Sequence, residues 1–294
     1  MHKAQAYFKG EGEEDKIRRI LLSILAIGLI SLLTVSFVGC KNPRYIYENG
    51  NVLVGGDGEP IELINNPNAT NPTYAELIAF IQQDTTDTND YLENPIIGYV
   101  CADFAEDVHN NAEAAGIRVA LVSINFEGSD KGHACNAFDT TNMGLIYIDC
   151  TGQSFSDKLN LRLVETEEGF SFVSEGPTSW DAIAYVEIDK EYGLIPITKS
   201  KALTYSFYEE YKQKWQEYRD LLNDFNNEVA QFNQEVRGKT YYEGSPELAR
   251  IEAWKAELEK QNKLIDKLSE ELGNVWFEPK GIVEDISTYW GQEE

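Results

Sequence analysis

The sequence predicts an α+β fold in which one helix packs on an antiparallel sheet, with an antiparallel coiled-coil hairpin attached. Three observations predict it. Apolar residues recur with a helical period between residues 101 and 115. Short runs of strand-forming residues, separated by turn residues, follow that helix. Between residues 208 and 272, apolar residues step by alternating threes and fours in two blocks, which is the pattern of a coiled coil.

The first forty residues carry a membrane signal. Ile20 to Val38 contains no charged side chain and follows three basic residues, and as a helix it would be about 28 Å long. It is either an uncleaved N-terminal anchor or a signal peptide cut before Cys40. The Val-Gly-Cys ending resembles a bacterial lipoprotein site, which implies lipidation at Cys40, and we favour this form over the anchor and over a cytosolic core helix. Residues 1–40 therefore predict a membrane-anchored, extracytoplasmic protein at the cell surface.

Residues 41–71 are rich in Asn, Gly and Pro, which predicts an extracytoplasmic tether. One short hairpin is expected within it, with Val52–Val54 against Ile61–Leu63 across the glycines. A domain over residues 72–200 follows. It begins with a short helix over Thr73–Gln82, for which Pro72 suits the first helical position.

The helix after residue 100 carries the first candidate site residue. Phe104, Ala105, Val108 and Ala112 define its apolar face, and Gly116 is a plausible stop. Cys101 then falls in the first helical turn. Unpaired N–H groups and the positive end of the helix dipole favour a thiolate over a thiol there.

Three strands are expected next, over Ile117–Phe126, His133–Phe138 and Leu145–Cys150. The last two read as a hairpin, and symmetry about Thr141 would place His133 opposite Asp149 on one face. Their Cβ atoms would then lie roughly 5 Å apart. Asp139 lies about 20 Å from His133 along the same strand and is the poorer partner. Further strands over Asn160–Val164, Phe170–Val173 and Ala182–Ile188 would extend the same sheet, which Ile195–Ile197 closes.

A cysteine on a helix, a histidine and a carboxylate together supply a nucleophile, a base and a group that orients the base. Tyr-x-Cys-x-x-Phe-Ala from Tyr99, Gly-His-Ala around His133 and Ile-Asp-x-Thr around Asp149 resemble, in that order, the transglutaminase-like branch of the papain-like cysteine enzymes. The resemblance covers about fifty residues. It implies a transglutaminase-like/papain-like core in which Cys101 is the nucleophile, His133 the general base and Asp149 its orienting partner.

Other polar residues near this motif have weaker assignments. Tyr99 and Asn94 are guesses for a side-chain oxyanion donor beside the Cys101 backbone N–H. Cys135 replaces the aromatic residue that follows His-Ala in many relatives, and Cys135 and Cys150 read as buried hydrophobes. The predicted hairpin places these two cysteines on opposite faces, so no disulfide is expected between them. His109 reads as a surface or packing residue.

Residues 201–274 predict the coiled-coil hairpin. One seam runs from Tyr208 through Trp215 to Val236, and a second from Ile251 to Leu272 contains one polar position, Gln261. The hairpin either packs only with itself or offers a surface to a partner or to a second copy. Residues 275–294 look extended, and their return to the sheet would make the hairpin an insertion.

Net charge and the absence of certain motifs exclude some classes of function. A net charge of −25 argues against nucleic acid as a partner. The sequence shows no metal-ligand cluster and no motif for a cofactor. We expect a thiol enzyme that acts on protein or peptide substrates through a thioester, with hydrolysis favoured over crosslinking. The alternatives are a non-catalytic surface module that binds or spaces proteins, and a cell-wall peptidase of a related papain-like type.

Overall fold

A computed structural model describes residues 44–48, 50–152, 161–166, 169–174, 179–273 and 275–291. The chain divides into two units, Met1–Asn42 and Pro43–Glu294, and the second is described below. The predicted membrane segment and Cys40 lie outside the described residues, so their assignment stays a prediction. Within the described ranges, no helix has the length and apolar character needed to cross a membrane.

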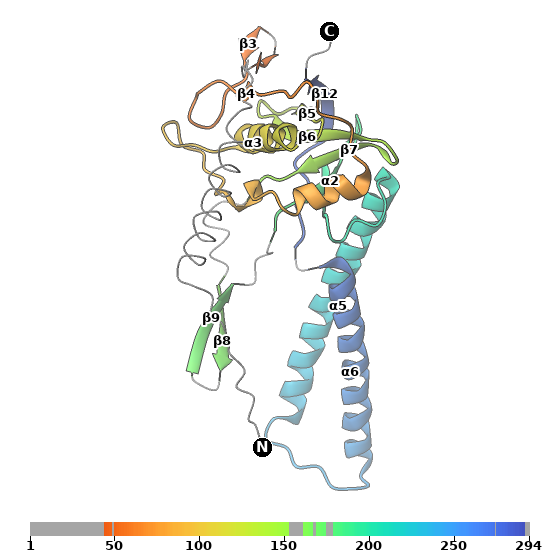
Figure 1. The fold of residues 1–294 in the computed structure, drawn as a ribbon. Coiled ribbons are helices and arrows are strands. Elements are labelled where there is room, and N and C mark those ends of the chain that lie inside the picture. The colour runs from red at the N-terminus through yellow and green to blue at the C-terminus, as the bar shows by residue number, and fades with distance from the viewer. Residues whose placement is uncertain are drawn as a thin grey trace, which may run out of the picture. The chain divides into compact units, whose positions relative to one another are not determined.

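The centre of this unit is a six-stranded sheet with the spatial order β11-β10-β7-β6-β5-β12 (Figure 1). Each strand runs antiparallel to its neighbours. The strands are β5 (Ala120–Phe126), β6 (His133–Thr140), β7 (Gly144–Asp149), β10 (Ala182–Tyr185), β11 (Gly193–Pro196) and β12 (Val283–Trp290). Helix α3 (Cys101–Ala114) packs on β6 and β5, which confirms the prediction of a helix on an antiparallel sheet.

The two faces of the sheet bury different residues. Val108 and Ala112 of α3 pack with Phe138 and Ile148 in one apolar cluster. A second cluster contains Val122, Cys135, Ala137, Leu194 and Val283, and no residue of α3. Side chains alternate between the faces along each strand. His133 and Asp149 therefore share the face of Cys135, opposite the face that Val108 and Ala112 cover. His133 is the first residue of β6, and Cys101 is the first residue of α3.

The β6–β7 hairpin is confirmed, but its predicted register is wrong by two residues. Thr140 pairs with Gly144 and Asn136 with Ile148, so the loop is centred on Asn142 rather than Thr141. The loop follows the three-residue pattern in which a left-handed residue ends the turn, and Gly144 has φ +75°. A shift by two leaves every side chain on its predicted face because the period of a strand is two residues.

Residues 44–71 differ from the expected tether, since they pack on α3 and the sheet. Ile46, Ile61 and Leu63 are buried in a cluster with Ala102 and Ala105 of α3. Of the predicted hairpin, only the part next to the glycine-rich turn forms, where the Ile61 N–H donates to the Leu53 carbonyl oxygen. Val52 pairs with Tyr47 and Leu63 with Arg44, so the rest of that prediction is wrong. The short strands here are β1 (Arg44–Tyr45), β2 (Tyr47–Glu48), β3 (Asn51–Val52) and β4 (Glu62–Leu63).

The next helix, α2 (Tyr74–Ile81), starts one residue later than predicted. Thr73 is its N-cap and forms a capping box with Glu76, so Pro72 precedes the cap. A single 3-10 turn, η1 (Thr86–Thr88), connects α2 to the segment that leads into α3.

Strands β8 (Leu161–Thr166) and β9 (Gly169–Ser174) form their own two-stranded antiparallel sheet. The prediction that they extend the main sheet is therefore wrong. The prediction that the strand beginning at Ala182 extends it is confirmed, since β10 pairs with β7 and β11 pairs with β10. Strand β10 also ends at Tyr185 rather than Ile188.

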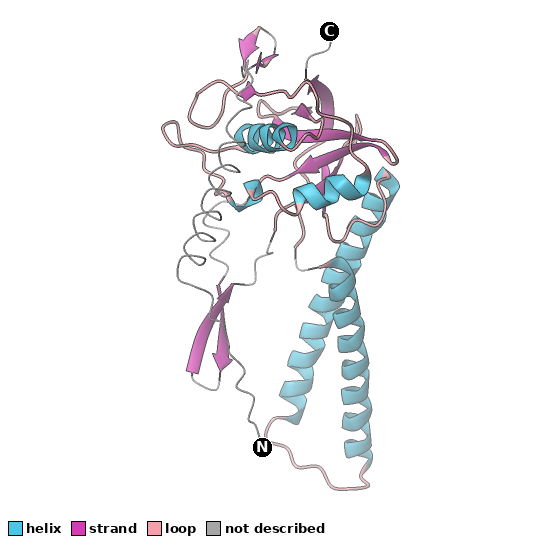
Figure 2. Cartoon of the chain, viewed as in Figure 1, coloured by secondary structure: helices cyan, strands magenta, loops and turns pink. Residues whose placement is uncertain are grey.

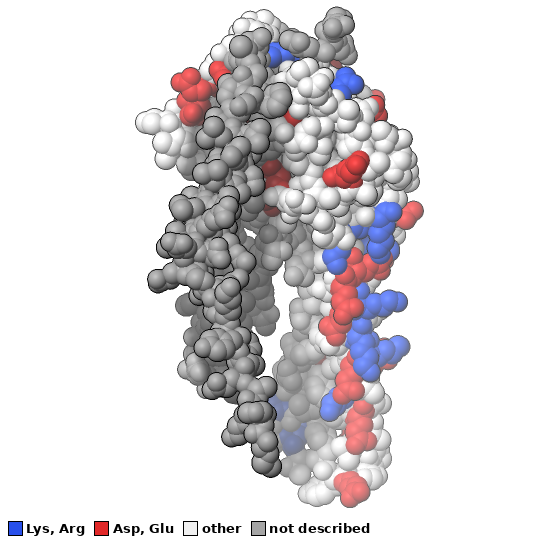
Figure 3. Space-filling model, viewed as in Figure 1, with Lys and Arg blue, Asp and Glu red and all other residues white. Residues whose placement is uncertain are grey.

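The predicted coiled-coil region is confirmed as two long helices that pack on each other, α5 (Tyr205–Val236) and α6 (Pro246–Leu272) (Figure 2). Ile251, Leu258, Ile265 and Leu272 are buried at heptad spacing on α6. Lys and Arg alternate with Asp and Glu along the outside of the helices, as Figure 3 shows. Strand β12 pairs with β5, so the hairpin is inserted between two strands of one sheet, as residues 275–294 suggested.

Candidate active site

Cys101 is the first residue of α3, and Val100 is the N-cap. Val100 has no side-chain acceptor for the first N–H groups of the helix, and the Asp103 carboxylate in the first turn binds the backbone before the helix instead. It accepts hydrogen bonds from the backbone N–H of Val100 at 2.7 Å and of Gly56 at 2.8 Å. The thiol is half-buried. The prediction that Cys101 lies in the first helical turn is confirmed.

The segment of chain that leads into Cys101 touches a second loop, and the contact requires glycine in both. A Cβ atom on Gly98 would lie 2.3 Å from the Gly56 carbonyl oxygen, and one on Gly56 would lie 2.6 Å from the Gly98 carbonyl carbon. Neither backbone can accommodate that contact. The folded segment over residues 44–71 is thus packed against the residues that lead into the helix.

Asn136 fixes the helix to the strand that carries the histidine. Its side chain is buried on the α3 face of β6, and its amide donates to the Ala105 carbonyl oxygen at 2.8 Å. Ala105 lies one turn beyond Cys101. This bond sets the position of the first turns of α3 against β6, and sequence reasoning assigned Asn136 no role.

His133 and Asp149 are in direct contact. The His133 Nε2 atom lies 2.7 Å from Asp149 Oδ2, and both side chains are almost wholly buried. Under the corrected register they are diagonal rather than directly opposed neighbours. Asp149 Oδ1 accepts from the Thr151 backbone N–H at 2.9 Å. Because Nε2 is engaged by Asp149, Nδ1 is the ring nitrogen left for the thiol.

Electrostatics couple the three groups. Burial raises the pKa of the Cys101 thiol, but the charge of His133 and hydrogen bonds from His133 and the Ala134 backbone outweigh it and hold that pKa below its ordinary value. Burial and the charge of Lys280 lower the pKa of His133, and Asp149 and Cys101 more than compensate, so it is raised. Burial works against ionisation of Asp149, yet His133 holds its pKa well below the usual range. The lowered pKa of Cys101 and the raised pKa of His133 together favour a thiolate beside an imidazolium.

Tyr192 is a member of the site that the sequence did not reveal. It is fully buried, and its hydroxyl donates to Asp149 Oδ2 at 2.9 Å. Its ring meets the His133 ring edge-on, with 5.1 Å between centroids. Tyr192 directly precedes β11, which forms one edge of the sheet. No spacing motif links it to the hairpin, so only the sheet order could have identified it.

The two guessed oxyanion donors make other hydrogen bonds, Tyr99 through its hydroxyl and Asn94 through its amide oxygen. The Tyr99 hydroxyl is hydrogen-bonded to Asp107 and accepts from the Asn89 amide at 3.1 Å. Asn94 Oδ1 accepts from the backbone N–H of Ile96 at 2.9 Å, as in an Asx turn. The Cys101 backbone N–H remains the expected donor.

The other cysteines and the other histidine that the structure describes are buried packing residues. Cys101, Cys135 and Cys150 are all free thiols. Cys135 belongs to the core cluster on the Tyr192 face, Cys150 to the cluster on the α3 face, and burial raises both thiol pKa values. His109 is fully buried on α3, and its desolvation lowers its pKa to about 4, so it is neutral at pH 7.

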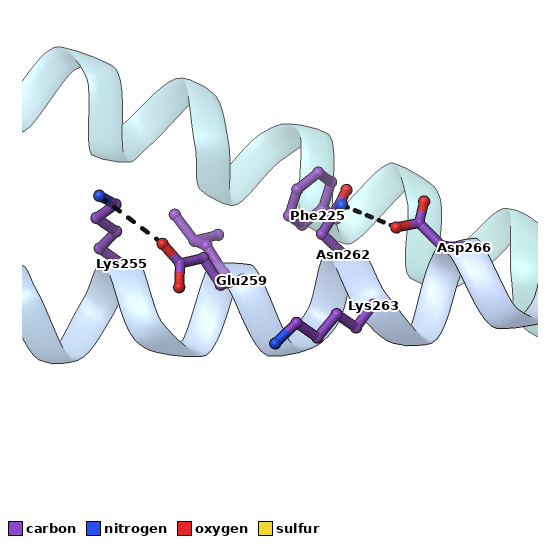
Figure 4. A pocket seen from close by; sticks show the side chains of 7 residues that line it. Phe225, Lys255, Glu259, Asn262, Lys263 and Asp266 are labelled. Atoms are coloured by element: carbon purple, nitrogen blue, oxygen red, sulfur yellow. Dashed lines mark hydrogen bonds and ion pairs between the residues drawn. The ribbon is translucent and has the colours of Figure 1, made fainter.

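A groove of about 460 Å³ lies away from this site, between α5 and α6 (Figure 4). Phe225 of α5 lies on one side, and the other lining residues come from α6. Four of its polar side chains form pairs, Lys255 with Glu259 at 3.7 Å and the Asn262 amide with Asp266 at 3.1 Å. These are exposed contacts of small energetic value. The described residues contain no group of His, Cys, Asp or Glu arranged to hold a metal ion.

Comparison with protein-family models, with curated proteins and with solved structures gave no match.

Proposed function

We propose that this protein is a transglutaminase-like thiol enzyme that acts on peptide or carboxamide bonds through Cys101, His133 and Asp149. The observation that carries the proposal is the chain of contacts from the helix N-terminus to the buried carboxylate. Cys101 opens α3, its thiol interacts with His133, and His133 Nε2 lies 2.7 Å from Asp149. Tyr192 and Thr151 hold Asp149 in place.

The proposed reaction uses these groups in order. The Cys101 thiolate attacks the carbonyl carbon, and the carbonyl oxygen takes the negative charge beside the Cys101 N–H. The His133 imidazolium gives its proton to the departing amine as the carbon–nitrogen bond breaks, leaving a thioester. Water, deprotonated by His133, then releases the acid and the thiol. An amine in place of water would give a crosslink, and hydrolysis is the reaction we favour.

Site-resolved alkylation of the full-length protein tests the proposal. The rate at Cys101, Cys135 and Cys150 would be measured by mass spectrometry from pH 5 to pH 9, in wild type and in His133→Ala. Fast labelling of Cys101 alone near pH 6, lost in His133→Ala, is expected for a thiolate–imidazolium pair. Cys135 and Cys150 serve as internal controls because both are buried and their thiol pKa values are raised.

The opposite result is equally informative. A Cys101 that titrates like an ordinary thiol, with a pKa of about 8.5, would refute the catalytic proposal. The non-catalytic alternative would then direct attention to the α5–α6 hairpin. It predicts that Cys101→Ala leaves the function of the protein unchanged.

A further inference from the structure

Lys280 lies at the rim of the proposed active site, in the segment that joins α6 to β12. The next residue, Gly281, accepts a hydrogen bond from the Tyr192 backbone N–H at 2.8 Å. Ile282 forms a bridge with Glu191 on the other side of Tyr192. The backbone that directly follows Lys280 is therefore tied to Glu191 and Tyr192, and the Tyr192 hydroxyl holds Asp149. The Lys280 side chain itself is exposed.

Among the residues that the structure describes, Lys280 makes no ion pair or hydrogen bond through its ammonium group. Each of the other described lysines and arginines of residues 44–152, 179–219 and 275–291 contacts a carboxylate, a backbone carbonyl or an aromatic ring. Lys131, two residues before His133, pairs with Glu93 at 3.6 Å. Lys280 therefore keeps its positive charge without a paired carboxylate, in a chain with a net charge of −25.

The position of Lys280 carries an electrostatic cost. Its charge lowers the pKa of His133 and so opposes the imidazolium form, although it also favours the anionic forms of Cys101 and Asp149. A bound anion would neutralise Lys280 and remove its repulsion of His133. The net charge of −25 repels anions, so a local cation favours the approach of an anionic group on a substrate to Cys101.

We propose that Lys280 is an anion subsite of the active site and that the substrate carries a carboxylate near the carbonyl group that Cys101 attacks. The proposal rests on the proposed function and names its substrate class: acidic peptides or carboxylate-bearing carboxamides. Lys280 offers three donors on a flexible stem, which suits a carboxylate held at a solvent-exposed rim.

Two small alkylating reagents, one anionic and one neutral, test this proposal in the full-length protein. Iodoacetate carries a carboxylate and iodoacetamide does not, and each forms the same carbon–sulfur bond with the thiolate and releases iodide. The ratio of their second-order rates at Cys101 cancels any change in the thiolate fraction. Lys280→Gln should lower the ratio of iodoacetate to iodoacetamide about fivefold, the effect of one charge a few ångströms away in water. Lys280→Glu should lower it further, and Lys280→Arg should preserve it.

Lys131→Gln is the matched control, since it removes a lysine near His133 that already has a partner, and it should leave the ratio within about twofold of wild type. At 1 M salt, where the Debye length is about 3 Å, the difference between wild type and Lys280→Gln should shrink. An unchanged ratio in Lys280→Gln, with fast labelling of Cys101 near pH 6, would overturn the anion subsite and leave the proposed function standing. Slow labelling of wild-type Cys101 by both reagents would refute the proposed function and this inference together.

Discussion

Replacing Tyr192 by phenylalanine isolates the hydroxyl that sequence reasoning missed. The ring that packs against His133 stays, and only the O–H donated to Asp149 at 2.9 Å is lost. A hydrogen bond to a charged acceptor contributes about 1.5–3 kcal/mol, so we expect Tyr192→Phe to lower the free energy of unfolding by about 2 kcal/mol. Urea denaturation at pH 7 measures this value.

Tyr205→Phe is the matched control. Its hydroxyl donates to the uncharged Glu191 carbonyl oxygen at 2.8 Å, for which about 1 kcal/mol is expected. The folded-state pKa of Asp149 is depressed, so its ionisation stabilises the fold above the unfolded pKa of about 3.9 and is lost only as the pH falls through the folded value. The penalty of Tyr192→Phe should therefore be constant from pH 5 to pH 8. A penalty no larger than that of Tyr205→Phe would refute the assignment of Tyr192 to the Asp149 carboxylate.

Two further substitutions test the site. Asp149→Asn removes the charge that raises the pKa of His133; the pKa of Cys101 should then rise by about one unit, lowering its alkylation rate at pH 6.5 about tenfold. An unchanged pH profile would show that Asp149 does not act through His133. Asn136→Ala removes the buried bond to Ala105 and should cost about 1–3 kcal/mol in urea denaturation while slowing Cys101 alkylation, whereas a stability loss with normal alkylation would mean that Asn136 does not position α3.

The proposed triad residues could be brought together from sequence because their contact survives an error in register. The hairpin centre was misplaced by one residue, which shifts pairing by two. Since the strand period is two, His133 and Asp149 stayed on one face and remained within reach as diagonal neighbours. An error of one residue in pairing would have placed them on opposite faces. Helix α3 was similarly secure because Cys101, the apolar stripe and Gly116 all agree on its bounds.

Residues 44–71 show where prediction from local sequence patterns fails, because this segment is folded and was expected to be a tether. Ile46, Ile61 and Leu63 belong to short apolar stretches in a segment rich in Gly, Asn and Pro, and these stretches are too short to indicate which elements they pack against. Their burial comes from contacts with α3, such as the bond from the Glu62 N–H to Glu106 at 2.9 Å. Such tertiary contacts have no local signature, so composition alone suggested a tether.

The crossing segment before β12 explains why Tyr192 and Lys280 could not be placed in advance. Strands β11 and β12 form opposite edges of the sheet, and the chain between them contains the whole α5–α6 hairpin. On its return the chain packs Phe277 on the core of the Tyr192 face and binds Tyr192 through Gly281. The path from one edge to the other therefore passes the face that holds His133 and Asp149. Tyr192, 43 positions after Asp149, and Lys280, 131 positions after it, come near the triad because of this path, which follows from strand order rather than from any sequence motif.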